Sequence, residues 1–227
     1  MEGDLEEIDD GVWCLQSHFV AWGCNGSLRM TIIKTSSGLL IYSPVRLGPR
    51  TIEEVHRLGH VATIVAPNLF HHIYLRYCID AFPDARVLVP DGLERKIGAI
   101  PRAEVTTQAT AIDAFGGIEH HVVTGHVLRE TVLFHVATRT LITADLLYNY
   151  QREHYPAEKA FFRLIGCYGA PKVAFYHRFA ISKKGSIGRL IDQVRSWAPR
   201  RIIMCHGRII EAEDAGELFA DAWQRLS

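Results

Sequence analysis

The order of strand-like and helix-like patterns is the feature of this sequence that most limits its fold. Strand-like alternation of apolar and polar residues runs through 12–20 and 28–42, and helices and buried strands alternate over 49–89. A second strand-rich stretch, 118–143, is again followed by helical spacing, a buried strand and a last amphipathic helix over 211–226. Two facing sheets with helices on their outer sides bury all of these apolar faces. The sequence therefore predicts an α/β fold built as a two-sheet sandwich.

The expected elements follow from periodicity and from turn residues. The expected strands are Val12–Val20, Leu28–Lys34, Leu39–Tyr42, Val61–Ala66, Arg86–Val89, Ile118–Val123, Thr131–Val136, Thr140–Thr143 and Arg201–Cys205. The expected helices cover 52–58, 73–82, 157–165, 186–197 and 211–226, with a further short helix through Lys96 that Asp91 is expected to cap. The stretch 100–113 is too weakly patterned for an assignment.

Size and composition predict one domain over residues 1–227. Layered α/β folds of this length form a single core. Apolar residues make up 48% of the chain and charged residues 22%, which is far from the composition of disordered proteins. No internal repeat or linker-like stretch divides the sequence.

Charge and cysteine usage narrow the expected partners and compartment. Lys plus Arg equals Asp plus Glu at 25 each, so we expect neither a nucleic acid nor an anionic membrane surface as a partner, but a small-molecule substrate. The first residues are acidic, and no apolar run approaches the ~18 residues of a membrane span. Five cysteines without a Cys-x-x-Cys pair indicate a reducing compartment. We therefore expect a cytoplasmic protein, and the oligomeric state stays open.

Metal-competent side chains follow four of the expected strands, each just past the strand's carboxyl end. These side chains are His71 and His72, His126, Asp145, and His206. The loops beyond the carboxyl ends of strands in βα units share one edge of a sheet, so residues far apart in sequence meet there. Histidine and aspartate bind zinc, iron and manganese. The pattern predicts a metal site at this edge.

A simpler interpretation applies to each of these residues taken alone. A histidine beside glycine, as in Gly125-His126 or His206-Gly207, is more often a turn residue that bonds to the backbone. Asp145 on its own fits the cap of a following turn. The metal hypothesis therefore depends on all four strand exits together.

Other histidines receive structural or supporting roles. His135 lies inside an expected hairpin strand and fits a cross-strand partner. His177 follows two aromatic residues and is a candidate for supporting a ligand or for proton transfer. The remaining histidines fall on strands, helix faces or loops without the strand-end relation: His18, His56, His60, His120, His121 and His154. No Gly-x-Ser-x-Gly elbow, Walker loop or dinucleotide fingerprint occurs.

Several blocks of sequence together resemble a known family. They are Arg29-Met30-Thr31-Ile32-Ile33, Gly38-Leu39-Leu40-Ile41-Tyr42-Ser43-Pro44, Ile64-Val65-Ala66-Pro67-Asn68 with His71-His72, Phe82-Pro83-Asp84-Ala85, Thr138-Arg139-Thr140-Leu141 and Ala144-Asp145. Over about Val12 to Gly207 the chain resembles an uncharacterised family, a domain of unknown function related to metallo-β-lactamases. The resemblance implies an αββα sandwich with a metal site on one edge of the two sheets.

The resemblance also implies an altered metal site. The wider superfamily carries Thr-His-x-His-x-Asp-His where this chain has residues 66–72, so Pro67 and Leu69 replace the two leading histidines, His71 replaces the aspartate, and the last histidine is His72. An alignment shifted by one residue is the alternative. The later blocks around His126, Asp145 and His206 resemble those of the superfamily. The resemblance therefore favours one divalent metal ion, zinc or iron, over two.

Three functional hypotheses remain open at this stage. The leading one is a metal-dependent hydrolase in which His72, Asp145, His206 and either His71 or His126 hold an ion that activates water for attack on an ester, lactone, amide or phosphoester. His71 acts there as a ligand or as the proton acceptor. The second is a degenerate binding protein with an apolar pocket near Phe70, Phe162 and Tyr176 and no metal. The third is an iron-dependent oxidative enzyme on the same fold.

Overall fold

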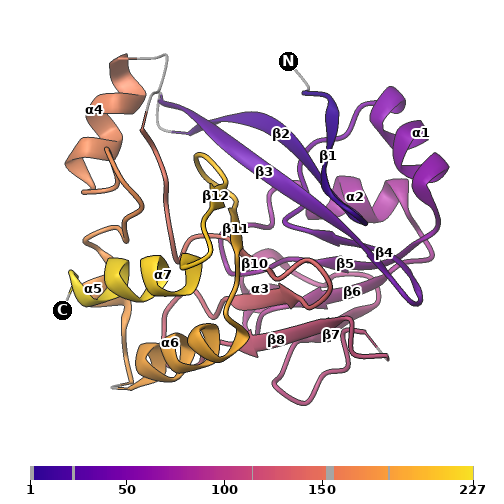
Figure 1. Ribbon diagram of the computed structural model, residues 1–227. Helices are drawn as coiled ribbons and strands as arrows, with labels where there is room; N and C mark the ends of the chain where they lie inside the picture. Colours follow the sequence, from indigo (N-terminus) through magenta and orange to yellow (C-terminus); the bar gives the residue numbers. More distant parts are fainter. Residues whose placement is uncertain (1–2, 22–23, 114, 152–155, 184, 227) are drawn as a thin grey trace.

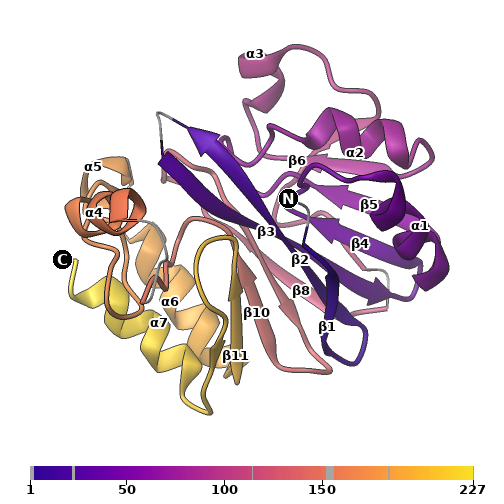
Figure 2. The ribbon, with the colours of Figure 1, turned by 90° about the horizontal axis from the view of Figure 1, so that it is seen from above.

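Two β-sheets lie face to face, and helices cover the outer side of each. The computed structural model describes residues 3–21, 24–113, 115–151, 156–183 and 185–226. Seen from above, α1 and α2 lie outside the sheet that contains β4 to β6, and α6 and α7 lie outside the sheet that contains β10 and β11 (Figure 2). This arrangement confirms the predicted αββα sandwich.

The first sheet has seven strands in the order of the sequence. They are β1 (Leu5–Asp9), β2 (Val12–Ala21), β3 (Cys24–Thr35), β4 (Gly38–Tyr42), β5 (Val61–Val65), β6 (Arg86–Val89) and β7 (Ala103–Val105). The strands from β1 to β4 pair antiparallel, whereas β4 to β7 pair parallel. The two edge strands, β1 and β7, were not predicted, because both are mostly half-buried or exposed and carry little apolar alternation.

The second sheet has five strands in the order β12-β11-β10-β9-β8. They are β8 (Ile118–Val122), β9 (Thr131–His135), β10 (Thr140–Thr143), β11 (Arg201–Met204) and β12 (Ile210–Glu211). The predicted hairpin between β9 and β10 is confirmed, and β10 pairs parallel with β11. The carboxyl ends of β10 and β11 therefore lie next to each other.

Seven helices are described, and Figure 1 labels each of them. They are α1 (Pro49–Leu58), α2 (Leu75–Ala81), α3 (Leu93–Ile97), α4 (Pro156–Leu164), α5 (His177–Ala180), α6 (Ser186–Trp197) and α7 (Ala215–Gln224). Two expectations were wrong. Gly92 rather than Asp91 caps α3, because the carboxylate of Asp91 pairs with Arg129 and Arg95 instead. The last helix begins at Ala215 rather than at residue 211, because Ile210 and Glu211 pair with β11 as a strand.

Alternation along the second sheet divides its side chains between two apolar layers. Leu133, Ile142 and Ile203 belong to the core between the sheets, whereas their neighbours Leu141 and Ile202 pack in the core beneath α6 and α7. Successive residues of a strand point to opposite faces, so a strand that is buried on both sides reads as continuously apolar. The short run at the end of β10 thus fixes which way the following Asp145 faces.

Two further observations concern membranes and cysteines. Within the part of the chain that the structure describes, no helix is both long enough and apolar enough to cross a bilayer. Four thiols are free and buried: Cys14, Cys78, Cys167 and Cys205. Of the histidines assigned structural roles, His154 and the side chain of His18 lie outside the described residues.

Candidate metal centre

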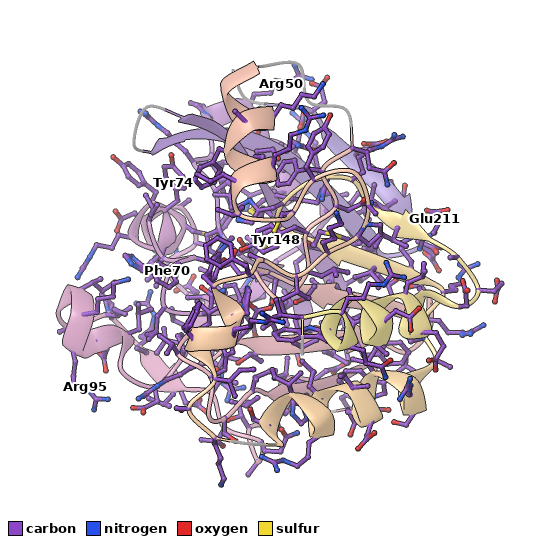
Figure 3. The ribbon with its side chains drawn as sticks, turned by 90° about the vertical axis from the view of Figure 1, so that its left-hand side faces the viewer. Arg50, Phe70, Tyr74, Arg95, Tyr148 and Glu211 are labelled. Carbon is purple, nitrogen blue, oxygen red and sulfur yellow. The ribbon has the colours of Figure 1, made fainter. Side chains whose placement is uncertain are left out.

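Three side chains from different strand ends meet at one edge of the sandwich. His71 follows β5, Asp145 follows β10 directly, and His206 follows β11. Ligand atoms of these three residues all lie within 4.8 Å of one another, and each residue is less than 10% exposed. Figure 3 views the side of the molecule on which α4 and α5 lie, with Tyr148, three residues after Asp145, near the middle of the view. The structure therefore brings together three of the five residues that the strand-end pattern singled out.

The ring nitrogens of the two histidines point at each other and at the carboxylate. The Nε2 atoms of His71 and His206 are 3.3 Å apart. The Nε2 of His71 is 3.2 Å from Oδ2 of Asp145, and the Nε2 of His206 is 3.2 Å from Oδ1. Three donor atoms thus surround one small volume.

The other ring nitrogen of each histidine is held by Ser43, which follows β4, or by Ser27 of β3. Nδ1 of His71 lies 2.8 Å from Oγ of Ser43, and Nδ1 of His206 lies 2.7 Å from the backbone carbonyl of Ser27. A carbonyl only accepts, so His206 carries a proton on Nδ1, and Nε2 is the ring nitrogen that a metal ion would use. Such outer partners fix the tautomer and orientation of metal-binding histidines.

Asp145 is surrounded by donors. Asn68 Nδ2 donates to its Oδ2 at 2.9 Å, and the hydroxyl of Tyr148 donates to its Oδ1 at 3.1 Å. Burial by itself raises the pKa of Asp145, but the charges and hydrogen bonds of His71 and His206 outweigh it, so this pKa lies well below its usual value. Asp145 is therefore a carboxylate that accepts bonds on both oxygens.

Asn68 joins the centre to a second buried carboxylate, that of Glu130. The amide nitrogen of Asn68 also donates to Glu130 at 2.9 Å, while its carbonyl accepts the backbone N–H groups of Phe70 and His71. Glu130 is fully buried and accepts three more bonds, from Thr143 Oγ1 and from the backbone N–H groups of residues 144 and 145. Burial and the nearby Asp145 raise the pKa of Glu130. A network of satisfied polar groups thus supports the loop that carries His71.

His71 carries the charge that balances Asp145. Burial lowers the pKa of His71, but the neighbouring carboxylate more than offsets this effect, so that its pKa lies well above the usual value. The centre therefore favours one positive charge beside Asp145, and either a proton or a metal ion provides it.

The loop that carries His206 is held by Arg29 of β3. The Arg29 guanidinium donates to the carbonyl of Met204 at 2.6 Å and to that of Gly207 at 2.8 Å. Gly207 has φ +87°, and a Cβ there would lie 2.4 Å from the carbonyl oxygen of Asn149. Only glycine fits this approach. The His-Gly pair in the sequence thus reflects the close passage of another backbone segment.

The structure does not bring the other two predicted ligands into this group. His72 is half-buried, and it does not belong to the group of ligand atoms that lie within 4.8 Å of one another. His71 is the histidine of this loop that lies beside Asp145 and His206.

His126 is buried near the centre but is engaged elsewhere. Its Nδ1 accepts the backbone N–H of Leu128, and its Nε2 lies 2.9 Å from Nδ1 of His177. Burial lowers the pKa of both histidines to about 4, so the pair is neutral at pH 7. His177 thus supports His126 rather than a ligand. His135 bonds to Thr138 in the β9–β10 hairpin, in line with the structural role expected for it.

The residues proposed for an apolar pocket do not line one cavity together. Phe162 is buried with its ring stacked on that of Tyr150, whereas Phe70 is 54% exposed. The hydroxyl of Tyr176 lies 2.6 Å from that of Tyr148 and so belongs to the surroundings of Asp145.

Sequence reasoning missed five residues that shape the centre: Ser27, Ser43, Asn68, Glu130 and Tyr148. Asn68 had a signal, because Pro67-Asn68 marks a turn directly before His71 and asparagine bonds to backbone two and three residues on. Tyr148 and Glu130 lie close in sequence to Asp145 and a strand start, but nothing in their local pattern shows burial. Their role depends on contacts between the sheets.

The donor set fits a divalent metal ion. Zinc–nitrogen bonds of about 2.0–2.1 Å at a tetrahedral angle place two ligand atoms roughly 3.3–3.4 Å apart. The two Nε2 atoms are separated by 3.3 Å, and each is 3.2 Å from a carboxylate oxygen. Two imidazoles and a carboxylate suit both zinc and iron. His71, Asp145 and His206 are therefore the residues that would hold the ion.

Comparisons with known proteins agree with this architecture. Residues 9–93 match the model of a domain of unknown function, DUF4336. Solved structures with a similar fold include DIM-1 metallo-β-lactamase (10% identity, 100% of this chain and 99% of that one, TM-score 0.68) and a metallo-β-lactamase from Pontibacter korlensis (14% identity, 98% of each chain, TM-score 0.66). A third is the metallo-β-lactamase FIM-1 from Pseudomonas aeruginosa in its mono-zinc form (12% identity, 98% and 95% of the chains, TM-score 0.65).

At identities this low, the structural similarity demonstrates the fold alone. No curated protein matches the chain. The resemblance noted in the sequence is nevertheless confirmed, because the family model and the fold point the same way. The chain has the metallo-β-lactamase fold, and its residues 9–93 match the domain family of unknown function DUF4336.

Proposed function

We propose that this protein is a hydrolase that uses one divalent metal ion held by His71, Asp145 and His206. The observation that carries the proposal is the meeting of two imidazole Nε2 atoms and one carboxylate within 4.8 Å at the carboxyl ends of three strands. A buried carboxylate with a strongly lowered pKa beside two histidines is a common mark of a functional site. The substrate class proposed is an ester, lactone, amide or phosphoester.

A divalent ion held by these three residues would supply Lewis-acid activation of water, because it would lower the pKa of that water to about 7. The residues of the chain prepare the site for it. Ser43 and the carbonyl of Ser27 hold the two Nδ1 atoms, so that both Nε2 atoms face one point. Tyr148 donates to Asp145 and stacks on the ring of His206, with ring centroids 5.6 Å apart, which fixes the carboxylate and the imidazole together.

One ion rather than two is supported by the surroundings of Asn68. Its amide nitrogen lies between the carboxylates of Glu130 and Asp145, 2.9 Å from an oxygen of each. This neutral donor satisfies carboxylate oxygens that a second cation would otherwise bind. His126, which follows β8 at the same edge, directs its Nε2 to His177. Among the structural relatives, FIM-1 is described in a mono-zinc form.

Metal analysis of the protein purified without an affinity tag tests the proposal. We expect about one zinc or iron ion per chain in the wild type, as three protein ligands are typical of catalytic sites. Asp145→Ala, His206→Ala and His71→Ala are each expected to lose most of it. His72→Ala is the matched control, because it removes a neighbouring histidine outside the group, and it is expected to retain the metal. Equal metal content in all five proteins contradicts the proposal.

Hydrolysis is tested next with p-nitrophenyl esters, a p-nitrophenyl phosphodiester and a chromogenic lactone. The expected activity disappears on chelation, returns on adding the metal identified by analysis, and is absent from Asp145→Ala. Activity that survives both chelation and Asp145→Ala comes from another site or a contaminant, and it contradicts the proposed role of the centre.

A further inference from the structure

Three segments lie around the metal centre, and together we name them the site rim: residues 66–77, which reach into α2, 124–129, and 172–183, which include α5. Backbone hydrogen bonds connect them side by side. The N–H of Leu69 donates to the carbonyl of Leu128 at 3.2 Å, and the N–H of Val127 donates to that of Ala180 at 2.8 Å. The site rim is therefore one continuous surface rather than three separate loops.

Each segment of the site rim has a buried polar side and an exposed apolar side. The buried side holds Asn68, His71, His126 and His177, all less than 10% exposed. Their neighbours in sequence face outward: Phe70 and Val127 are each 54% exposed, and Phe179 is 82% exposed. The apolar groups thus stand beside the same residues that form the centre and its surroundings.

Exposed apolar side chains are concentrated on this surface. Six of the ten large apolar side chains that are exposed in the described part of the chain lie on the site rim: Phe70, Ile73, Tyr77, Val127, Phe175 and Phe179. Contiguous exposed apolar surface around a site indicates a ligand or partner that covers it, whereas single exposed residues need no explanation.

The charge of the site rim has one sign. The three segments contain no Asp or Glu, although the whole chain has as many acidic as basic residues. They contain five basic residues: Arg76, Arg129, Lys172, Arg178 and Lys183. Arg129 is paired with the carboxylate of Asp91. Arg76, Lys172 and Arg178 donate to backbone carbonyls, which leaves their positive charge without a carboxylate in these contacts. From the neighbouring α3, Lys96 adds a charge that lies 4.5 Å from the ring centroid of Phe70.

We propose that the site rim binds a small organic anion that carries an apolar group, and that molecules of this class are the substrates of the centre it surrounds. The second half of this statement rests on the proposed hydrolase function, whereas the first half does not. Apolar side chains and positive charges without carboxylates complement a ligand with an apolar body and an acidic group. A cation or a fully polar solute gains little from the same surface.

The test uses 8-anilinonaphthalene-1-sulfonate, an aromatic anion, on the full chain after chelation of metal. Working without metal separates this proposal from the hydrolase proposal, because binding to the site rim does not need the ion. Saturable binding of one probe molecule per native chain is expected. Octanoate is expected to displace the probe, and octylammonium at the same concentration is not.

Paired variants locate the binding. We expect Phe70→Ser with Phe179→Ser, and separately Lys96→Glu with Lys183→Glu, to weaken probe binding at least about tenfold, the change that loss of one or two apolar or charge contacts produces. Phe115→Ser is the control for the apolar pair, because Phe115 is 85% exposed but lies outside the site rim. Arg50→Glu is the control for the charge pair, since Arg50 is an exposed residue of α1. Both controls are expected to bind the probe as the wild type does.

Four outcomes overturn the proposal. The first is equal weakening by the control and site-rim variants. The second is equal displacement by octanoate and octylammonium. The third is that octanoate does not bind, but the wild-type protein sediments with phosphatidylserine-containing vesicles and the double variant Phe70→Ser with Phe179→Ser does not. This result would make the site rim a membrane contact. The fourth is a wild-type dimer that the same double variant converts to monomer, which makes the site rim an interface between two copies of the chain.

Discussion

The Nε2 atoms of His71 and His206 face each other at 3.3 Å, although 135 positions of sequence separate the two residues. One follows β5 of the first sheet and the other follows β11 of the second. Their meeting requires both sheets to end at the same edge and both imidazoles to be held by their Nδ1 atoms. The stability of this contact therefore depends on residues that do not themselves bind metal.

Ser43 is the partner whose removal we expect to weaken metal binding most selectively. In Ser43→Ala, His71 loses its bond at Nδ1, and we expect zinc affinity to fall about 10- to 100-fold, as for other outer partners of metal-binding histidines. Chelator-competition titration measures this affinity. Ser37→Ala, in the exposed β3–β4 turn, is the control and is expected to bind zinc as the wild type does.

A glycine variant separates the hydroxyl of Ser43 from its backbone. Ser43 has φ +57°, a left-handed conformation that costs a residue with a side chain roughly 1–2 kcal/mol and costs glycine almost nothing. Both variants lose the hydroxyl, but only alanine keeps the unfavourable φ, so Ser43→Gly is expected to be more stable than Ser43→Ala in urea unfolding of the metal-free protein, yet to lose zinc affinity as Ser43→Ala does. If Ser43→Gly keeps the zinc affinity of the wild type while Ser43→Ala loses it, the hydroxyl does not have this role.

Arg29 is expected to matter mainly for stability. Arg29→Met leaves the buried carbonyls of Met204 and Gly207 without their donor, which we expect to reduce the free energy of unfolding by about 2–4 kcal/mol. Arg50→Met removes an exposed arginine with ion pairs to Asp4 and Glu54, and we expect a loss below about 0.5 kcal/mol. Urea unfolding of both variants makes the comparison, and equal losses refute the bracing role of Arg29.

The sequence predicted the position of a residue of the centre where that residue comes just after the end of a strand. Asp145 and His206 come directly after β10 and β11, two short apolar strands that pair parallel, so their placement followed from periodicity. The choice between His71 and His72 did not, because it depends on which way a turn faces. The carbonyl of the Asn68 side chain sets that direction by accepting the N–H of His71.

Contacts between sheets left no pattern in the sequence. Glu130 reads as an ordinary charged residue before a strand, yet it is fully buried and bonded to Asn68 and Thr143. The edge strands β1 and β7 were not predicted for a related reason: a strand at the edge of a sheet with little buried surface needs no regular apolar alternation. Local periodicity predicts which face of a strand or helix is buried. It does not predict the buried Glu130 or the edge strands, because these depend on contacts with particular residues far away in sequence.

Replacing Asn68 tests whether its amide is required between the two carboxylates. In metal-free Asn68→Asp, three carboxylates share a buried site, and we expect a loss of about 3–5 kcal/mol at pH 8. The repulsion raises a carboxyl pKa in the folded state above its unfolded value, so the folded variant binds an extra proton and its loss relative to wild type shrinks as the pH falls toward 5.

Asn68→Leu is the matched variant, because it removes the same hydrogen bonds without adding charge. Its loss is expected to depend only weakly on pH. Urea unfolding at pH 5 and pH 8 compares the two variants with the wild type. A pH dependence equally strong in both variants argues against charge repulsion as the cause.

Asp9 provides a prediction on the pH dependence of stability at a point remote from the centre. Its carboxylate accepts from Arg200 and Arg201, so it joins β1 of the first sheet to the start of β11 in the second. The hydrogen bond from Arg201 is the main cause that lowers the pKa of Asp9 below its usual value, so the stabilisation is complete above the unfolded pKa of about 3.9 and is lost as the pH falls through the lower folded value. Asp9→Asn is therefore expected to be less stable than wild type at pH 7, by about 1 kcal/mol or less because the pair is partly exposed, and to approach the wild type as the pH falls through the folded pKa of Asp9. Urea unfolding across this pH range measures the difference, and a constant difference down to pH 2 would mean that the amide disturbs packing between the sheets rather than the ion pair.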